Sequence, residues 1–341
     1  MKLRTLFAPL AITLVTLIPA LAIPVQAAGP ITLSYANFPP APTFPCVQME
    51  RWKTEVEKRT GGKVAVNTYP GGTLLGAKAM MDGVIAGQAD IGCLSMAYQP
   101  GRFMLTNATG LPVGIPDSRV GSLVLLDIYK KYQPAAFAQV KVLAMFTTAP
   151  TNIMSKVPVR KLEDLSGLAL RASGPAAQVL GAWGANPVGM PMPATPEALQ
   201  KGVVKGLLSS LEVMKDFKFA EMCPYATMTD AVIYPFAVVM NMDRWNSLPE
   251  DVKAVMEALI TEQSEWTGTY MDNHVAEAIQ WSKDTHNVEF ISLDTTEKAR
   301  WDAKLAPSSM TGKPKRGKRG CPRTESLPTS RPESPVTAAD P

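Results

Sequence analysis

The sequence predicts an α/β protein whose strands run parallel and whose length allows two domains of ordinary size. Residues 31–36 alternate as a strand does, residues 47–59 place apolar side chains on one helical face, and residues 63–69 form a second strand. This strand–helix–strand order predicts a parallel sheet. The 341 residues suffice for two proper hydrophobic cores. In such sheets ligands bind at the loops that follow the carboxyl ends of the strands.

The first 27 residues have the pattern of a secretory signal peptide. Two basic residues precede an apolar run over 6–23, and Val25 and Ala27 are small residues at the −3 and −1 positions of a cleavage site. Pro9 and Pro19 make this run a poor permanent membrane helix, and no later stretch is apolar for long enough to span a bilayer. We therefore expect cleavage after Ala27 and an exported, soluble mature chain.

The positive charge of the chain comes from its two ends. The formal net charge is +4, but two basic residues lie in the signal segment and the sequence after Pro307 contributes a further +4. Residues 28–307 are left with a net charge of −2. A nucleic-acid partner requires a basic face, so the composition excludes that class of function.

The four cysteines are Cys46, Cys93, Cys223 and Cys321. They contain no C-x-x-C pair, and both histidines lie far from them in sequence, so we expect neither a zinc site nor another cofactor. Export permits a disulfide, and Cys46 and Cys93, at the ends of predicted strands, are the candidate pair. Two buried thiols are the alternative, because free cysteine is commonly a core residue.

No set of residues predicts catalysis. A Ser-His-Asp triad needs a histidine, and His274 and His286 fall in a late predicted helix and just past its end. The acid pairs Glu163-Asp164 and Glu250-Asp251 stand at predicted helix starts, where carboxylates favour the helix dipole. We interpret them as capping groups and expect no enzymatic activity.

Two loops of the first half supply candidate ligand contacts. Asn37 opens a proline-rich loop, residues 37–45, that cannot pair into a sheet. Tyr98 follows a predicted strand over 91–96, and it either floors a pocket or packs as an ordinary core residue. The glycine-rich turn over 69–76 predicts a tight loop, since it matches neither a P-loop nor G-x-G-x-x-G. The other elements expected here are a helix over 77–86, helical segments around 121–132 and a strand over 140–146.

The stretch 161–175 delivers a single arginine to a strand end. It predicts a helical turn over 162–165, a short apolar strand that carries Arg171, and a break that starts a helix over 176–183. The planar guanidinium of Arg171 can hold a carboxylate bidentately with charge assistance. The alternative is a surface arginine in an ordinary ion pair.

Further elements follow in the second half. A strand over 152–155 begins it, and Thr195 is expected to cap a helix whose first residue is Pro196. Pro249 opens a long helix through about residue 284. Its inward-facing side chains are expected to be Val252, Val255, Met256, Leu259, Ile260, Trp266 and Tyr270.

Several motifs, in this order, resemble one known family. They are Leu75-Gly76, Gly87-Gln88-Ala89-Asp90-Ile91, Asp164-Leu165-Ser166-Gly167 with Arg171, Ala198-Leu199-Gln200, Gly202-Val203-Val204 and Gly206. The set is similar to the periplasmic solute-binding subunits of TRAP transporters, the DctP-type family. The resemblance extends over about residues 31–307.

The resemblance implies the two-domain fold of periplasmic binding proteins, with a ligand cleft between the domains and a long late helix spanning both. Domain I would take residues 28–149 and about 236–270, and domain II residues 150–235 and about 271–307. Residues 234–241 would form the strand that returns to the first domain. Closure would be a hinge motion that sequesters the ligand.

The resemblance also implies a function in transport. The chain would capture an organic acid in the periplasm, as a monomer, and deliver it to the small and large membrane subunits of a permease. Arg171 would clamp the carboxylate. After Gly206, relatives often place an asparagine where this chain has Ser209 or Ser210, and Glu197 and Lys205 replace an aromatic residue and an aspartate. A secreted α/β enzyme and an ABC-type binding protein for a small anion are the alternatives.

The character of the pocket follows from its expected apolar residues. They are Trp183, Met190, Met192 and Phe236. Together with the serines they indicate an acid with an aryl or aliphatic body, because a sugar acid would need more amides and carboxylates for its hydroxyls. Methionine as a core filler is the alternative for Met190 and Met192.

The sequence after Pro307 departs from the family pattern. It is rich in Pro, Ser, Lys and Arg and lacks helical periodicity, so we expect a disordered basic tail over 308–341. Relatives end in helices with a motif like Leu-Pro-Ala-Asp. Joining the last base of each codon to the first two of the next permits that motif at residues 320–324, so a frameshift is compatible with the sequence.

We predict that a one-base correction near the codons for residues 307–311 restores a helix and raises the thermal stability of the protein. The restored helix would cover apolar side chains, each of which contributes about 1.5–3 kcal/mol when buried. Resequencing the gene and melting the restored protein check this. A restored frame that stops early or encodes no helix would show that the basic tail is native.

Overall fold

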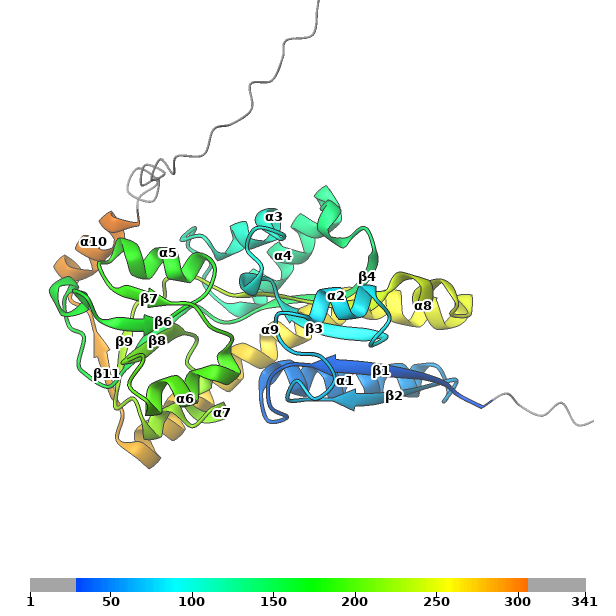
Figure 1. Ribbon diagram of the computed structural model, residues 1–341, viewed down its shortest axis with the longest axis horizontal. Helices are drawn as coiled ribbons and strands as arrows, with labels where there is room; N and C mark the ends of the chain where they lie inside the picture. The colour runs from blue at the N-terminus through cyan, green and yellow to red at the C-terminus, as the bar shows by residue number, and fades with distance from the viewer. Residues whose placement is uncertain (1–28, 306–341) are drawn as a thin grey trace, which may run out of the picture.

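The computed structural model describes residues 29–305 and folds them into two sheets with helices packed around each (Figure 1). The first sheet has the strand order β2-β1-β3-β10-β4, and the second has the order β11-β9-β5-β8-β6-β7. The predicted α/β class is therefore confirmed, whereas the signal segment and the tail after Pro307 lie outside the described residues. The strands are β1 (Ile31–Asn37), β2 (Val64–Tyr69), β3 (Ile91–Ser95), β4 (Val140–Thr147), β5 (Asn152–Ser155), β6 (Ala169–Arg171), β7 (Asn186–Val188), β8 (Gly206–Ser209), β9 (Tyr225–Met228), β10 (Pro235–Asn241) and β11 (Glu289–Ser292).

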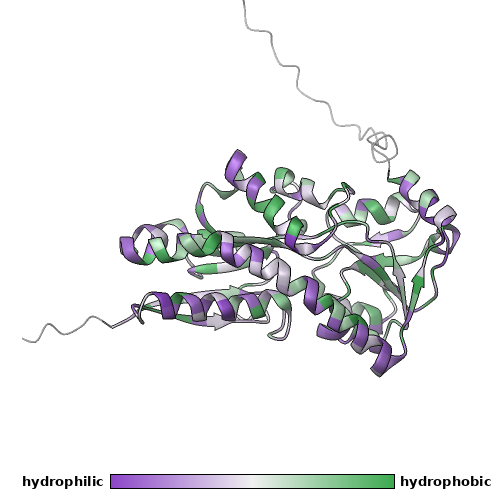
Figure 2. Ribbon diagram, turned by 180° about the vertical axis from the view of Figure 1, so that it is seen from behind, coloured by the Kyte–Doolittle hydropathy of each residue, from purple (hydrophilic) through white to green (hydrophobic). Residues whose placement is uncertain are grey.

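Helices cover both sheets, and their apolar sides face the strands (Figure 2). Within residues 29–305, no helix combines the length and the apolar character that a membrane crossing requires. The α-helices are α1 (Phe44–Arg59), α2 (Met80–Ile85), α3 (Met104–Asn107), α4 (Ser118–Tyr132), α5 (Pro175–Ala182), α6 (Thr195–Gln200), α7 (Val213–Asp216), α8 (Met242–Asn246), α9 (Glu250–His286) and α10 (Thr295–Lys304). Short 3₁₀ turns cover Met96–Tyr98, Ala108–Gly110, Ala135–Phe137, Leu162–Leu165, Met192–Ala194 and Phe219–Glu221.

The first sheet is mixed rather than fully parallel. Strand β1 pairs in parallel with β2 and β3, as the strand–helix–strand order predicts. Strand β10 runs antiparallel between β3 and β4, because it is the segment by which the chain returns from the second sheet. Its register places Phe236 beside Ser95 and Pro235 beside Thr147, at the ends of β3 and β4. Residues far apart in sequence therefore meet at one sheet edge.

The second sheet places two parallel strand ends side by side. Strand β6 pairs in parallel with β8 and β7, while β5 runs antiparallel to β8 and β9. Gly206 begins β8 where the backbone of β5 approaches closely, since a Cβ atom there would lie 2.2 Å from the Met154 carbonyl oxygen. Because β6 and β8 end at the same edge, Arg171 and Ser209 lie on neighbouring strands at that edge.

The long helix α9 joins the two units. It begins at Glu250, after Pro249 as N-cap, and ends at His286, where Asn287 adopts a left-handed conformation with φ of 52°. It packs against α1, α4 and β4 beside the first sheet and against α7 beside the second. Figure 1 shows the helix running from one unit to the other behind both sheets. The predicted late helix is thus present, with nearly the predicted ends.

The middle of α9 differs from the prediction. Val252, Met256 and Leu259 are buried as expected, but Trp266 and Tyr270 are only half-buried and stack on each other. The buried positions in this stretch are the small or polar residues Gln263, Ser264, Thr267 and Gly268. The physical reason is close helix packing, because the Gly268 backbone meets the start of α4 and the Gln263 amide donates to the Gln48 carbonyl of α1 at 2.8 Å.

Two local predictions need correction. Thr195 is the first residue of α6 rather than its cap, and Ala194 holds the cap position because the preceding 3₁₀ turn runs directly into the helix. Cys46 lies in the first turn of α1, not at a strand end. In the structure Cys46 and Cys93 are free, buried thiols, which is the alternative to the candidate disulfide. Burial raises the pKa of the Cys46 thiol to about 12, and its Sγ donates to the Pro39 carbonyl at 3.3 Å.

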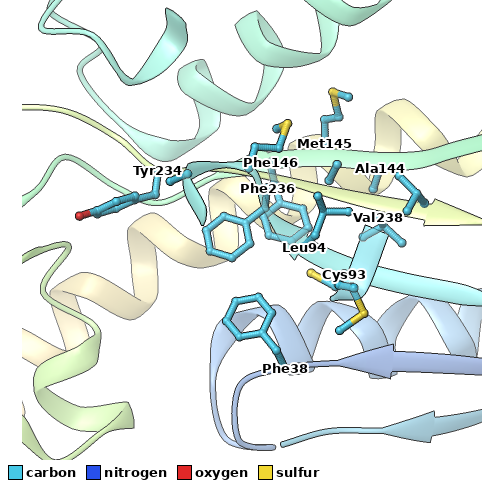
Figure 3. Close-up of a cluster of buried hydrophobic side chains, with 14 of the residues drawn as sticks. Phe38, Cys93, Leu94, Ala144, Met145, Phe146, Tyr234, Phe236 and Val238 are labelled. Atoms are coloured by element: carbon cyan, nitrogen blue, oxygen red, sulfur yellow. The ribbon is translucent and has the colours of Figure 1, made fainter. Parts of the chain in front are cut away.

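The buried aromatic and aliphatic side chains of the first unit form a continuous core that reaches its sheet edge. Figure 3 shows Phe38, Phe146 and Phe236 gathered there, with Cys93 close by and the Tyr234 ring extending away from them. The ring centroids of Phe146 and Phe236 lie 5.4 Å apart in a stacked arrangement. Aromatic side chains therefore lie both in the core and at the edge of the first sheet.

We predict that Gly268→Ala destabilises the protein by roughly 1–3 kcal/mol, as overpacking of a close contact does. The added Cβ would lie 2.6 Å from the Arg119 Cα atom and 2.9 Å from the Ser118 carbonyl oxygen, so α9 and α4 would have to separate. Gly181→Ala in α5 is the matched control, because no atom lies within 4 Å of its added Cβ. Alanine has the higher helix propensity, so the control should gain about 0.5–1 kcal/mol. Equal melting shifts for both variants would contradict the packing argument.

Candidate ligand-binding site

A cavity lies between the two sheets, at the loops that follow strands β1, β3, β6 and β8. This is the location expected for a ligand site in sheets with parallel strands. The empty space within it, open solvent at its mouth included, is about 480 Å³. The lining residues are Phe38, Pro39, Thr43, Phe44, Pro45, Ser95, Tyr98, Thr148, Arg171, Met192, Ser209, Glu212, Val213, Asp216, Phe217, Tyr234 and Phe236.

Arg171 is the buried cation of this cavity. It ends β6 and is only 1% exposed. Its Nε and Nη2 atoms both donate to the Met190 carbonyl, at 3.0 and 2.9 Å, and its guanidinium carbon lies 5.8 Å from the centroid of the Tyr234 ring. Within residues 29–305, Arg171 has no carboxylate partner, and its Nη1 atom makes no hydrogen bond to the protein. Nη2 also donates to the Ser173 hydroxyl at 3.4 Å, so the Nη1 end of the guanidinium is the part without a partner.

Aromatic rings form the wall on the side of the first sheet. Phe38 follows β1 directly, and its ring lies 5.5 Å from Tyr98 and 6.3 Å from Phe236, measured between centroids. Phe44 meets Phe236 edge-on at 5.6 Å. The Tyr98 hydroxyl accepts a hydrogen bond of 3.0 Å from the Met192 backbone N–H, which joins the two units across the cavity.

Carboxyl groups stand on the α7 side of the cavity. Glu212 precedes α7 and is 2% exposed, and its Oε2 atom is buried without a hydrogen-bond partner. Asp216 ends α7, and its Oδ1 atom lies 2.7 Å from Nε2 of His274 on α9, while its Oδ2 atom is buried without a partner. Burial raises the pKa of the Glu212 carboxyl to about 8, so this group is mainly protonated at neutral pH.

The sequence and the fold match a known family of transport proteins. The family model described as bacterial extracellular solute-binding protein, family 7, matches residues 39–311. The chain belongs to this family. Its members are solute-binding proteins for transport and not enzymes, and the predicted DctP-type membership and two-domain fold are confirmed.

Relatives in the family differ in the ligands that they bind. A TRAP periplasmic solute-binding protein of Desulfovibrio salexigens is 59% identical, with 82% of this chain and 87% of that chain covered and a TM-score of 0.73; it was solved as an open complex with the C-terminus of a symmetry mate in its ligand-binding site. A marine metagenome protein specific for aromatic acids is 28% identical, with coverage of 81% and 89% and a TM-score of 0.77. The C4-dicarboxylate-binding protein DctP of Rhodobacter capsulatus is 25% identical over 304 residues, with coverage of 84% and 88%.

Five of the residues predicted to contact the ligand line the cavity, and others lie outside it. Arg171, Ser209, Tyr98, Phe236 and Met192 all line the cavity. Whether they bind ligand stays a prediction, but their side chains or backbone face one shared space.

Four expected contacts lie elsewhere. Trp183 packs against Trp301 with its Nε1 donating to the Trp301 carbonyl, because α5 carries it away from the cavity edge where that helix begins. Met190 contributes its carbonyl to Arg171, while its side chain joins the core of the second unit. Asn37 is fully buried behind the lining and donates to the Pro45 carbonyl at 2.7 Å. Ser210 is buried next to the lining residue Ser209 but does not line the cavity.

Several residues that line the cavity were not predicted from the sequence. Phe44 lies in a stretch interpreted as loop, yet α1 begins there, with a proline in the first turn where its missing N–H costs nothing. The position of Phe38, in a loop directly after a parallel strand, could have indicated that it lines a ligand site. Asp216 and His274 are 58 residues apart and meet only because α9 crosses α7. No pattern in the sequence indicates that pairing.

We predict that Glu212→Gln flattens the decline of stability with rising pH. A folded pKa of about 8 against an ordinary value of 4.5 means that the wild type loses stability as pH rises between these values, at roughly 1 kcal/mol per pH unit. The hydrogen bond with Asp216 raises the pKa of His274 above 6.5, and its contribution is also lost as pH rises. The interval from pH 5 to 6.5 therefore isolates Glu212.

Denaturant unfolding at several pH values measures this effect. Between pH 5 and 6.5, the free energy of unfolding of Glu212→Gln should fall less steeply with pH than that of the wild type. Above that interval, both proteins should show a similar loss of stability from His274. Parallel pH profiles for the two proteins would show that Glu212 is ionised in the folded state.

Proposed function

We propose that the chain is the extracytoplasmic solute-binding subunit of a TRAP-type secondary transporter and binds an organic acid through Arg171. The observation that carries the proposal is a guanidinium 1% exposed, facing a cavity, with no carboxylate partner within residues 29–305. A buried charge is costly unless it is paired and hydrogen-bonded. A ligand carboxylate would supply the missing partner.

The hydrogen bonds of Arg171 favour a defined orientation of that carboxylate. The Met190 carbonyl accepts from Nε and Nη2, which fixes the rotation of the guanidinium plane. Nη1 makes no hydrogen bond within residues 29–305, and Nη2 makes only a long hydrogen bond of 3.4 Å to the Ser173 hydroxyl besides the one to Met190. A ligand carboxylate that displaces this long bond would meet both nitrogens as a fork. Ser209, on the neighbouring strand end, offers a hydroxyl to the same group.

Relatives support an acidic ligand. A polypeptide C-terminus ends in a carboxylate, and such an end occupies the ligand site of the Desulfovibrio salexigens protein. The marine relative is specific for aromatic acids, and the Rhodobacter relative is named for C4-dicarboxylates. All three names or structures are consistent with a carboxylate as the shared feature.

The charges in the cavity favour a monocarboxylate. Asp216 is paired with His274, and burial keeps Glu212 mainly protonated, so Arg171 is left as the uncompensated charge among the lining residues. The aromatic wall of Phe38, Phe44 and Phe236 suits an aryl body. Trp183 and Met190, which the sequence indicated as apolar pocket residues, do not line this cavity.

The remaining features of the proposed function follow from family membership and from the sequence. We propose a periplasmic location after cleavage at Ala27, a monomer, and transfer of the ligand to the small and large membrane subunits of the permease. Domain I would comprise residues 28–149 and about 236–270, and domain II residues 150–235 and about 271–307. The proposed hinge motion would close these domains on the ligand.

We predict that Arg171→Lys lowers the affinity for the acid ligand by roughly 2 kcal/mol, about 30-fold, because lysine keeps the charge but loses the fork. Arg160→Lys is the matched control, since Arg160 is exposed and pairs with Glu289 away from the cavity. Calorimetry with the acid that gives the largest stabilisation of the wild type measures both variants. Unchanged affinity in Arg171→Lys would refute the central role of this residue.

We further predict the outcome of a thermal-shift screen of carboxylic acids. Aryl and aliphatic monoacids should raise the melting temperature through mass action, and sugar acids and dicarboxylates should do so weakly or not at all. Sugar acids that stabilise the protein while aryl monoacids do not would overturn the assignment of an apolar pocket.

A further inference from the structure

The two carboxyl groups on the α7 side of the cavity each present one unused oxygen. Glu212 immediately precedes α7 and Asp216 ends it, a spacing of four residues that places both on one helical face. The Glu212 Oε2 and Asp216 Oδ2 atoms are both buried without a hydrogen-bond partner, and both residues line the cavity. The side chain of Asp216 is 4% exposed.

Such unpartnered oxygens are unusual in a folded protein. Buried polar atoms nearly always have a partner, and leaving one without a partner destabilises the fold. Asp216 is already fixed through its other oxygen, since Oδ1 is held by His274 and that histidine also faces Glu277 at 3.6 Å. The Ser210 hydroxyl is the nearby protein group that also interacts with Glu212, whereas the free Asp216 oxygen faces the cavity with no such neighbour among the described residues. These oxygens are therefore available to a ligand group.

We propose that Glu212 and Asp216 form a second polar subsite, which binds a hydroxyl group on the body of the acid ligand. The inference rests on the proposed function, because the ligand's carboxylate is assigned to Arg171. A hydroxyl can donate to one of these oxygens and accept from a protonated neighbour. The ligand class is thus a hydroxylated aryl monocarboxylic acid.

The charges on this side of the cavity favour a hydroxyl over the two charged alternatives. A second carboxylate would meet Asp216 with like charge, and Arg171 is the only lysine or arginine among the residues that line this cavity. An ammonium group would need net negative charge, but His274 already balances Asp216. Burial also disfavours the ionised form of Glu212. A neutral group that donates and accepts satisfies both oxygens without a new buried charge.

The apolar lining between the two polar subsites supports an aryl body for this ligand. Val213 and Phe217 of the α7 segment line the cavity beside the carboxyl groups, and Phe38 and Phe236 line it from the first sheet. A flat ring fits between such walls and carries a hydroxyl at a fixed distance from its carboxylate. A flexible aliphatic chain would lose more conformational freedom on binding.

Calorimetry with matched acid pairs tests the proposal. The pairs are 3-hydroxybenzoate and 4-hydroxybenzoate against benzoate, and 3-hydroxyphenylacetate against phenylacetate. For at least one pair, the wild-type protein should bind the hydroxylated acid ten-fold or more tightly than its parent. Glu212→Met should abolish that preference, whereas Glu212→Gln should keep most of it.

Each other outcome contradicts a distinct claim. Equal affinities within every pair, or a preference that survives in Glu212→Met, would overturn the second subsite while the Arg171 assignment stands. Tighter binding of isophthalate or of 3-(aminomethyl)benzoate than of any hydroxylated acid would also overturn it. If no acid of either set binds the wild type, the proposed ligand class fails and the subsite with it. Should Glu212→Met not fold, the wild-type pairs and Glu212→Gln decide the question.

Discussion

A guanidinium that is almost fully removed from water needs partners for its N–H groups, and a single backbone carbonyl, that of Met190, serves two of those on Arg171. This contact holds the side chain in one orientation at the end of β6. The Tyr234 ring packs near it, and the Tyr234 hydroxyl donates to the Leu208 carbonyl at 3.0 Å. The segment that returns to the first sheet is thereby tied to the same strand ends. The geometry of the cavity depends on this arrangement.

The segment that leads back to the first sheet passes close to that point, since the Tyr234 hydroxyl accepts a hydrogen bond from the Ser173 backbone N–H at 3.4 Å. Strand β10 begins beside Tyr234 and enters the first sheet between β3 and β4. Helix α9 then runs back along both units, and His274 on it holds Asp216 at the cavity. Residues at the ligand site thus contact β10 and α9, which both cross between the units. The proposed closing motion would bend the chain at these crossing segments.

The sequence correctly predicted that Arg171 ends a short strand, because the elements that position it are local. The turn over Leu162–Leu165, strand β6 with Arg171 and the following helix all form within one stretch, and turn residues define their ends. The contacts that sequence could not predict are those made by crossing elements. The pairing of Asp216 with His274 and the close packing at Gly268 depend on where α9 meets α7 and α4. Trp183 was misplaced for a related reason, since periodicity defines a helical face but not the neighbour that covers it.

A crystal structure of the protein with a bound acid, taken from the strongest stabiliser of the wild type, tests the central claim most directly. We expect a ligand carboxylate that accepts two hydrogen bonds from the Arg171 guanidinium, at about 2.7–2.9 Å, on the edge that the Met190 carbonyl leaves free. A ligand bound in this cavity with its carboxylate turned away from Arg171, or bound outside the cavity, would contradict it.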